Sequence, residues 1–330
     1  MRQVVAIALT YIGSVVGAGF ASGQEILQFF ARFGPLGLWG VLLSTIGFAW
    51  AGGKLLFIAK EIEAQSYQEV IVYLCGPRLG ALYDPLITFF LFGGFSIMLA
   101  GGGEALAMLL PISPLGGVLL MTLCTAIILK WGAVGLLKLN LYLVPPLVLG
   151  TLILFLLSLV RPVMAGVGGL LPHWWGSAIL YVSYNMILAT AVLASLGPQL
   201  TSSRQGLWAG IAGGLGLGAI LAANCYTLYQ GPLTGDLPLL EAAIRGGLLF
   251  QYSYSLVLWM AMITTAVANG YALLARLQPL AGPRGDWLFL FLCLAALPWT
   301  LLGFAQLIGF LYPLYGYLGL ILFPLLLAKT

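Results

Sequence analysis

The sequence predicts an all-α integral membrane protein with ten transmembrane helices, arranged as two inverted repeats of five helices each. Three observations lead to this prediction: the composition, the series of apolar segments, and a glycine-rich interruption inside the first segment. The chain is 62% hydrophobic and 7% charged, whereas a soluble domain carries about 25% charged residues. We therefore expect residues 1–330 to form one domain embedded in a lipid bilayer.

Ten apolar segments approach or exceed the roughly 20 residues that a helix needs to cross a bilayer. They lie at 3–31, 36–60, 82–110, 114–130, 133–160, 173–197, 205–229, 243–276, 286–303 and 305–328. In each half of the chain, 1–160 and 170–330, a long third segment precedes a short fourth one. Because five is an odd number of spans, the second half must be inverted relative to the first. Inverted repeats with interrupted helices in corresponding positions are typical of secondary transporters.

The basic residues predict the orientation of the chain. If the N-terminus is cytoplasmic, ten of the 13 Lys and Arg residues lie on the cytoplasmic side and only Arg32, Arg161 and Arg245 lie outside. Cytoplasmic loops of membrane proteins carry such an excess, so both termini are predicted to be cytoplasmic. The basic residues are scattered singly and give no indication of nucleic-acid binding.

The first apolar segment contains GSVVGAGFASGQE, from Gly13 to Glu25. Its four glycines predict an interrupted helix, because each interior glycine costs about 1 kcal/mol relative to alanine. Ser22 and Glu25 have the spacing of a capping box, which starts a new helix. Unwound backbone at membrane depth survives only inside protein or around a cavity, which indicates a ligand or ion site. Close helix packing is the alternative, since the glycines also fit the small-xxx-small pattern.

The sixth segment occupies the position that corresponds to the first, and its middle is polar. It reads Tyr181-Val-Ser-Tyr-Asn185, in which Ser183 and Asn185 can satisfy backbone groups that a break would free. A continuous helix with a polar packing face is the alternative, because this part of the segment has no glycine or proline.

The eighth segment carries the adjacent residues Thr264 and Thr265. Threonines in a membrane helix commonly bond back to their own helix. Their hydroxyls, together with carbonyls freed in the first helix, also suit a hard cation such as Na⁺.

Two motifs resemble the leucine-transporter (LeuT) fold. GSVVGAGF at 13–20 resembles the unwound first helix of that fold, and AMITT at 261–265 resembles the eighth-helix element of its sodium-coupled members. The phrase VGAGFASGQEILQFF is most similar to bacterial YkvI-like membrane proteins. The sixth segment departs from the amino-acid transporters of this fold because it lacks their glycine-containing break.

The resemblance implies a secondary transporter of the amino acid–polyamine–organocation superfamily in the bacterial cytoplasmic membrane, with helices 1 and 6 discontinuous. It also implies a Na⁺ ion bound by the carbonyls of Gly13, Val16 and Ala261 and by the hydroxyls of Thr264 and Thr265.

A zwitterion such as an amino acid would suit the two interrupted helices. The N-terminus of the half-helix that restarts after Phe20 favours a carboxylate; its surroundings are Gly17, Gly19, Phe20, Ala21 and Ser22. Carbonyls freed around Tyr181 and Ser183, beside Asn185, would suit an ammonium group, and Tyr184 offers an aromatic face. An organic cation or a nucleobase-like compound is the alternative.

Three charged residues in the predicted spans are candidates for gating or coupling, because charges are costly within a membrane. Glu25 fits the capping box, with proton or substrate binding as the alternative. Glu104 either gates the outer side with Arg32 or snorkels to the interface. Lys138 belongs to the cytoplasmic rim or, as in proton-coupled members of the fold, stands in for sodium.

The sequence therefore predicts a Na⁺-coupled symporter of a small polar organic solute that works by alternating access. A proton-coupled transporter of the same fold and a non-pumping receptor subunit related to germinant receptors are the alternatives. No cofactor other than Na⁺ is expected. An enzyme is not expected either, since no catalytic pair or triad is apparent and His173 is the single histidine. The four cysteines are expected to be buried small hydrophobes.

Overall fold

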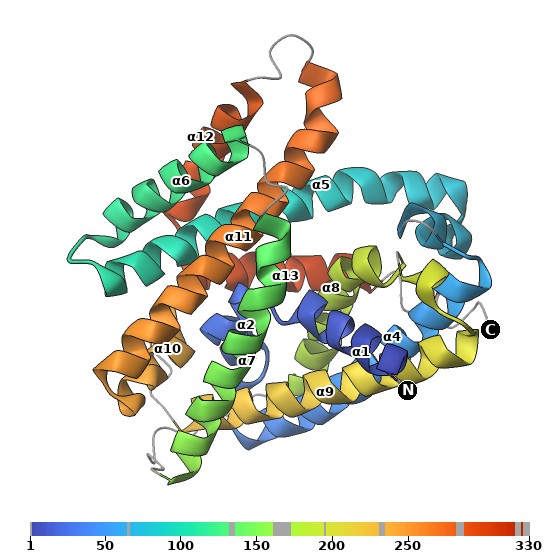
Figure 1. Ribbon diagram of the computed structural model, residues 1–330, viewed down its shortest axis with the longest axis horizontal. Coiled ribbons are helices and arrows are strands. Elements are labelled where there is room, and N and C mark those ends of the chain that lie inside the picture. The colour runs from blue at the N-terminus through green and yellow to red at the C-terminus, as the bar shows by residue number, and fades with distance from the viewer. Residues whose placement is uncertain are drawn as a thin grey trace.

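The structure is a computed structural model that describes residues 2–64, 67–131, 136–160, 173–194, 196–230, 235–281, 287–320 and 325. All regular secondary structure in these residues is helical (Figure 1). The all-α prediction is therefore confirmed.

The first predicted span is interrupted twice. It consists of α1 (Arg2–Val15), α2 (Ala18–Ser22) and α3 (Gln24–Phe29), followed by the short 3-10 helix η1 (Ala31–Phe33). Gly17 has an extended backbone between α1 and α2, and Gly23 has a φ of 85° between α2 and α3. Only glycine adopts this left-handed conformation without a steric cost. The predicted discontinuity of the first helix is thus confirmed.

The remaining helices are α4 (Pro35–Glu61), α5 (Tyr67–Leu109), α6 (Pro114–Trp131), α7 (Leu136–Val160), α8 (Trp174–Ala194), η2 (Gly197–Gln199), α9 (Ser203–Tyr229), α10 (Pro238–Ala242), η3 (Ala243–Gly246), α11 (Leu248–Ala281), α12 (Leu288–Thr300) and α13 (Phe304–Gly319). The long helices among them follow the predicted segments in order, although α5 begins at Tyr67 and the short helices η2, α10 and η3 were not predicted. Helix α5 is kinked at Gly76, whose φ of 77° is also left-handed.

Four helices in the described part of the chain are individually long and apolar enough to cross a membrane. Counting each of two bent pairs as one span raises this number to six, although α12 and α13 form one such pair and meet at 102°. Three further apolar helices are shorter. The protein therefore has several membrane-spanning helices, while the total of ten and the division at 160–170 stay predictions.

Helix α8 is continuous where the sequence suggested a break. Asn185 donates from Nδ2 to the carbonyl of Tyr181 at 3.0 Å, and the Ser183 hydroxyl donates to the carbonyl of Gly316 at 2.7 Å. These polar side chains find partners without unwinding the helix, so the expected freed carbonyls at Tyr181–Ser183 are absent. The bend, of 48°, lies further along, between Trp174–Thr190 and Val192–Gln199.

Helices α4 and α9 run side by side (Figure 1) and approach each other through glycines. A methyl group on Gly210 would lie 2.2 Å from the backbone nitrogen of Gly53, and one on Gly214 would lie 2.3 Å from that of Ala49. This backbone-to-backbone approach is the small-residue packing of membrane helices.

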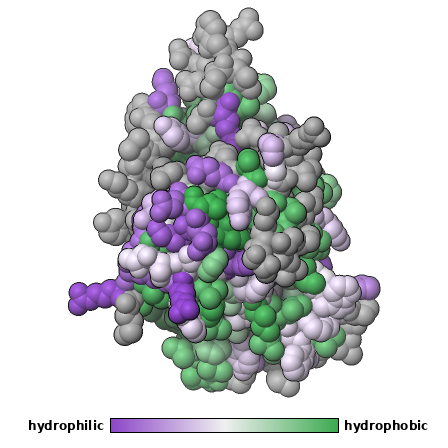
Figure 2. All heavy atoms as spheres, turned by 90° about the vertical axis from the view of Figure 1, so that its right-hand side faces the viewer, coloured by the Kyte–Doolittle hydropathy of each residue, from purple (hydrophilic) through white to green (hydrophobic). Residues whose placement is uncertain are grey.

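Polar residues gather at the end of the molecule from which α1 and α9 start (Figure 2). There the Gln3 side chain donates to the carbonyl of Gln199 and accepts a hydrogen bond from the side-chain amide of Gln205. The Ser203 hydroxyl donates to Glu61 at the end of α4. Because Arg2, Lys60 and Arg204 neighbour these residues in the sequence, this end carries basic residues from three helices.

Candidate functional site

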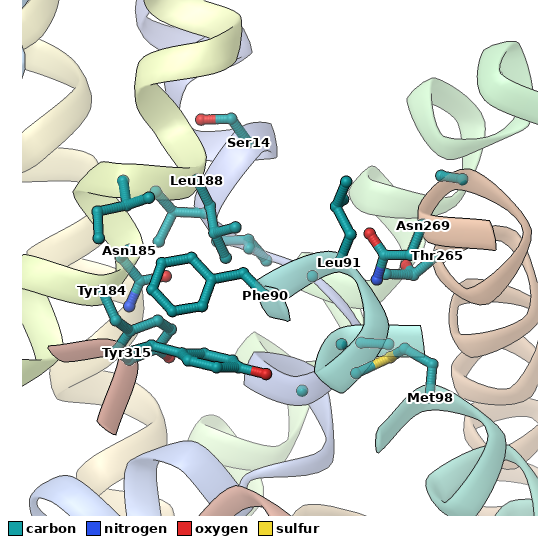
Figure 3. A pocket seen from close by; sticks show the side chains of 18 of the residues that line it. Ser14, Phe90, Leu91, Met98, Tyr184, Asn185, Leu188, Thr265, Asn269 and Tyr315 are labelled. Carbon is teal, nitrogen blue, oxygen red and sulfur yellow. The ribbon is translucent and has the colours of Figure 1, made fainter. Parts of the chain in front are cut away.

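A cavity of about 540 Å³ lies where the first interruption meets α5, α8, α11 and α13. In the close view (Figure 3), Tyr184, Asn185 and Tyr315 lie on one side, and Thr265 and Asn269 lie on the other. The backbone from Gly13 to Gly19 forms another part of the lining. The interruption therefore borders a cavity, as the constraint on unwound backbone in a membrane requires.

The interruption changes the backbone hydrogen bonding at the end of α1. In a regular helix the Gly17 N–H would donate to the carbonyl of Gly13. It donates instead to the carbonyl of Val15 at 2.9 Å. The Gly13 carbonyl is thereby released from its helical partner, and it belongs to a residue that lines the cavity.

Helix α11 presents hydroxyl groups opposite this backbone. Thr264 and Thr265 both donate to the carbonyl of Ala261, at 3.0 Å and 2.7 Å. Thr265 and Ala261 line the cavity, whereas Thr264 is only 1% exposed and is not part of the lining. Four of the five predicted ion ligands thus share one cavity: Gly13, Val16, Ala261 and Thr265.

Glu25 is buried in the lining of the cavity rather than in a helix cap. Its carboxylate accepts a hydrogen bond from the Tyr184 hydroxyl, and the Tyr312 hydroxyl is a second hydrogen-bonding neighbour. The carboxylate lies against Gly19, where a methyl group would come within 2.1 Å of Oε1. The absence of a side chain at Gly19 is therefore what makes room for the carboxylate.

The capping-box prediction for Ser22 and Glu25 is wrong. The cap of α3 is Gly23, which makes no side-chain hydrogen bond. Ser22 does accept from the Gln24 N–H at 3.2 Å, but its hydroxyl donates to the carbonyl of Gly19 at 2.6 Å. The glutamate turns away because two tyrosine hydroxyls offer it stronger partners than a single backbone N–H.

Aromatic rings form the wall beside Glu25. The ring centroids of Tyr184 and Tyr312 are 4.8 Å apart, and those of Phe90 and Tyr315 are 4.1 Å apart. The hydroxyl of Tyr315 is buried and has no hydrogen-bond partner among the described residues.

Sequence reasoning missed Phe90, Asn269, Tyr312 and Tyr315, all of which line the cavity. The spacing of the overlooked residues in the sequence could have pointed to two of them. Asn269 follows Thr265 by four residues, and Tyr315 follows Tyr312 by three, so each pair shares one face of a helix.

Several predicted substrate contacts lie outside the lining. Phe20, Ala21, Ser22, Tyr181 and Ser183 are all buried and are not among the lining residues. The new helix begins at Ala18, before Phe20 rather than after it, and contains five residues. So short a helix aligns few peptide dipoles, which weakens the expected attraction for a carboxylate. Gly17, Gly19, Tyr184 and Asn185 do line the cavity.

Of the other candidate charges, Glu104 is half-buried on α5 outside the cavity lining. No ion pair between Glu104 and Arg32 occurs in the residues that the structure describes. The side chain of Lys138 lies outside the described residues.

No family model matches the chain, but two relatives from Bacillus subtilis (strain 168) match along almost all of it. The uncharacterized membrane protein YkvI is 31% identical over 332 residues, covering 98% of this chain and 95% of YkvI. The protein YyaD is 33% identical over 326 residues, covering 97% of this chain and 94% of YyaD.

Three solved structures have a similar fold at low identity. MhsT in complex with L-phenylalanine has a TM-score of 0.64 at 16% identity, with 96% of this chain and 87% of MhsT covered. Mhp1, a nucleobase-cation-symport-1 family transporter, has a TM-score of 0.58 at 12% identity, with 97% of this chain and 74% of Mhp1 covered. A manganese transporter from Eremococcus coleocola has a TM-score of 0.53 at 14% identity, with 98% of this chain and 85% of the manganese transporter covered.

Mhp1 and the manganese transporter are both named as transporters. They show the architecture in which the interrupted first helix of this chain lies. Because YkvI and YyaD match almost the whole chain, the chain belongs to the YkvI family of bacterial membrane proteins. It has the LeuT fold.

Proposed function

We propose that the protein is a secondary transporter that couples Na⁺ entry to the uptake of a small polar organic solute by alternating access. The observation that carries this proposal is the cavity at the interruption of the first helix, bordered by freed backbone on one side and by α11 on the other. The LeuT fold supports it, since MhsT was solved with an amino acid and Mhp1 is a transporter.

The ion would lie between α1 and α11. Gly13, Val16 and Ala261 would supply carbonyl oxygens, and Thr264 and Thr265 would supply hydroxyl oxygens. The Thr265 hydroxyl uses its hydrogen on the Ala261 carbonyl and keeps lone pairs on its oxygen that can face a cation. Hard cations prefer such oxygen ligands.

The solute would occupy the rest of the cavity. Its volume of about 540 Å³ lies within the roughly 300–1,000 Å³ of small-molecule sites. Polar groups from α8 and α11, including Asn185 and Asn269, can orient a bound molecule. An amino acid is the first solute to test, because it was the sequence-based expectation.

The experiment is solute uptake into proteoliposomes with and without an inward Na⁺ gradient, using a panel of labelled amino acids and amines. Na⁺-dependent thermal stabilisation of the purified protein then locates the ion. Thr264→Ala and Thr265→Ala should each weaken the apparent Na⁺ affinity by about tenfold or more, because each removes a contact to a charged group. Thr264→Ser and Thr265→Ser retain the oxygen and should remain close to wild type.

Na⁺-independent uptake, or a wild-type Na⁺ response in both alanine variants, would count against the proposed ion site. A structural role for the threonines alone predicts that alanine is mild for stability and silent for Na⁺.

Proton coupling through Glu25 is a second candidate, favoured by the position of this carboxylate in the cavity lining. The groups that face it are the hydroxyls of Tyr184 and Tyr312, with Tyr181 nearby. Uptake driven by a pH gradient in sodium-free liposomes, and lost in Glu25→Gln, would establish this candidate in place of the first.

We also propose that both termini face the cytoplasm. The basic residues near the start of α1, the end of α4 and the start of α9 support this orientation, since polar contacts join these three ends. A cytoplasm-active reporter fused after Thr330 should be active, and activity of a periplasm-specific reporter at the same position would contradict the proposal.

A further inference from the structure

We propose that the solute is recognised through an ammonium group, which binds between the carboxylate of Glu25 and the rings of Tyr184, Tyr312 and Tyr315. This inference rests on the proposed transport function for its biological meaning, but it concerns binding alone. It narrows the small polar solute to an organic amine.

The charge of Glu25 favours a cationic ligand. Glu25 is the one ionisable acidic or basic residue other than tyrosine in the cavity lining that the structure describes. No ion pair that involves Glu25 occurs within the described residues, and the Lys60–Glu63 pair lies elsewhere in the chain. A buried carboxylate without a cationic partner is costly, and the two tyrosine hydroxyls offset only part of that cost. A bound organic cation would supply the missing positive charge.

An aromatic wall lies beside Glu25 and also favours a cationic ligand. The three tyrosines form a continuous series, with Tyr312 centred 4.8 Å from Tyr184 and 6.0 Å from Tyr315. Rings in this arrangement attract an ammonium group through cation–π interactions. The ring of Tyr315 also lines the cavity, and its buried hydroxyl has no hydrogen-bond partner among the described residues.

The rest of the lining is largely apolar. It includes Ile87, Leu91, Met98 and Leu188, and the close view places Leu91 and Leu188 at the cavity (Figure 3). These side chains suit a hydrocarbon body. The described lining holds no lysine or arginine that would bind a carboxylate. The cavity therefore favours an amine over the corresponding acid or alcohol.

The test compares three ligands of nearly equal size on the wild-type protein in potassium buffer, so that neither sodium nor choline competes. The probes are 2-phenylethylammonium, its neutral isostere 2-phenylethanol, and the anion 3-phenylpropionate. Binding is measured by thermal shift and by calorimetry in nanodiscs. The ammonium probe should bind about tenfold more tightly or better than the alcohol, taking the known value of hydrogen bonds to charged groups, and the anion should not bind.

Two variants assign the effect to residues. Glu25→Gln should remove the preference for the ammonium probe over the alcohol, while Tyr184→Phe, which keeps the ring and loses the hydroxyl, should reduce it. Glu104→Gln is the matched control, because it neutralises another carboxylate in a predicted span outside the cavity lining. It should leave the preference unchanged.

Equal binding of amine and alcohol to the wild-type protein would overturn the inference, whether or not the variants fold. An unchanged preference in a folded Glu25→Gln protein would overturn the role of this carboxylate. Amine binding without uptake would refute the transport proposal and leave the inference standing. Na⁺-driven uptake of solutes that lack an amine, with no effect of Glu25→Gln, would support the transport proposal and refute the inference that the solute is an amine.

Discussion

Helix α9 and the first span are both rich in glycine, but Gly210 and Gly214 on α9 have different surroundings from Gly13 and Gly17 on the first span. On α9 a methyl group at Gly210 or Gly214 would collide with the backbone of α4. On the first span a methyl group at Gly13 or Gly17 would meet nothing within 4 Å. The same spacing of small residues thus serves close packing in one helix and borders a cavity in the other.

The difference teaches how to separate two meanings of a glycine pattern. Both regions fit small-xxx-small spacing, and spacing alone left packing and interruption open for residues 13–23. The structure assigns packing to Gly210 and Gly214 on α9 and interruption to the backbone between Gly13 and Gly17. The distinguishing property is what a side chain at each glycine would touch.

The largest expected effect is the loss of stability from a substitution at the α4–α9 contact. Gly210→Leu places a bulky side chain where even a methyl group would lie 2.2 Å from the backbone of Gly53. Overpacking usually costs about 1–3 kcal/mol, and here neither helix backbone can yield without separating the pair. We expect little folded protein by size-exclusion chromatography and a much lower thermal midpoint.

The matched control for that variant is Gly176→Leu, since a side chain at Gly176 on α8 has open space around it. It should express and unfold like the wild type. If Gly210→Leu were equally well tolerated, the close approach of α4 and α9 would be refuted.

The second effect is on transport rather than on folding. Gly17→Leu should abolish uptake because its side chain would project into open space beside the cavity, while thermal stability stays near that of the wild type. Gly19→Leu should also abolish uptake, but by displacing the carboxylate of Glu25, which lies 2.1 Å from the position of the added carbon.

Proteoliposome uptake, normalised to the amount of inserted protein, checks both variants. Normal uptake in Gly17→Leu would show that the cavity at the interruption is not on the transport path. Normal uptake in Gly19→Leu, with uptake lost in Gly17→Leu, would mean that the cavity is on the transport path but that the position of the Glu25 carboxylate is not needed for transport.

The sequence predicted the helices well because their signal is local. Long apolar segments and clustered glycines are visible in a window of one span, so the order of the long helices and an interruption between Gly13 and Glu25 could be predicted, but the resumption of the helix at Ala18 could not. The neighbours of the cavity on α1 and α11 were also predicted, through short motifs at 13–20 and 261–265.

The remaining parts of the site depend on contacts between distant segments. Glu25 matched a local capping pattern, but its partner Tyr184 is 159 residues away. Ser183 suggested a broken helix, yet its hydroxyl bonds to Gly316 on α13, 133 residues away. A single sequence shows which polar groups need partners, but not which distant partner each one finds.

The smallest expected effect gives the sharpest contrast between the two regions. Gly13→Ala and Gly210→Ala are the same chemical change on two membrane helices. At Gly13 the new methyl group meets nothing within 4 Å, and alanine favours a helix over glycine by about 1 kcal/mol. Gly13→Ala should therefore leave the thermal midpoint unchanged or raise it slightly, with uptake within about twofold of wild type, since the Gly13 carbonyl is retained. At Gly210 the same methyl group meets backbone, so the helix-propensity gain is outweighed and the midpoint should fall. Thermal unfolding of the two variants measured side by side checks the sign of each effect. Destabilisation by both would mean that Gly13 also packs against a neighbour, and the interruption would then lose its distinction from the α4–α9 contact.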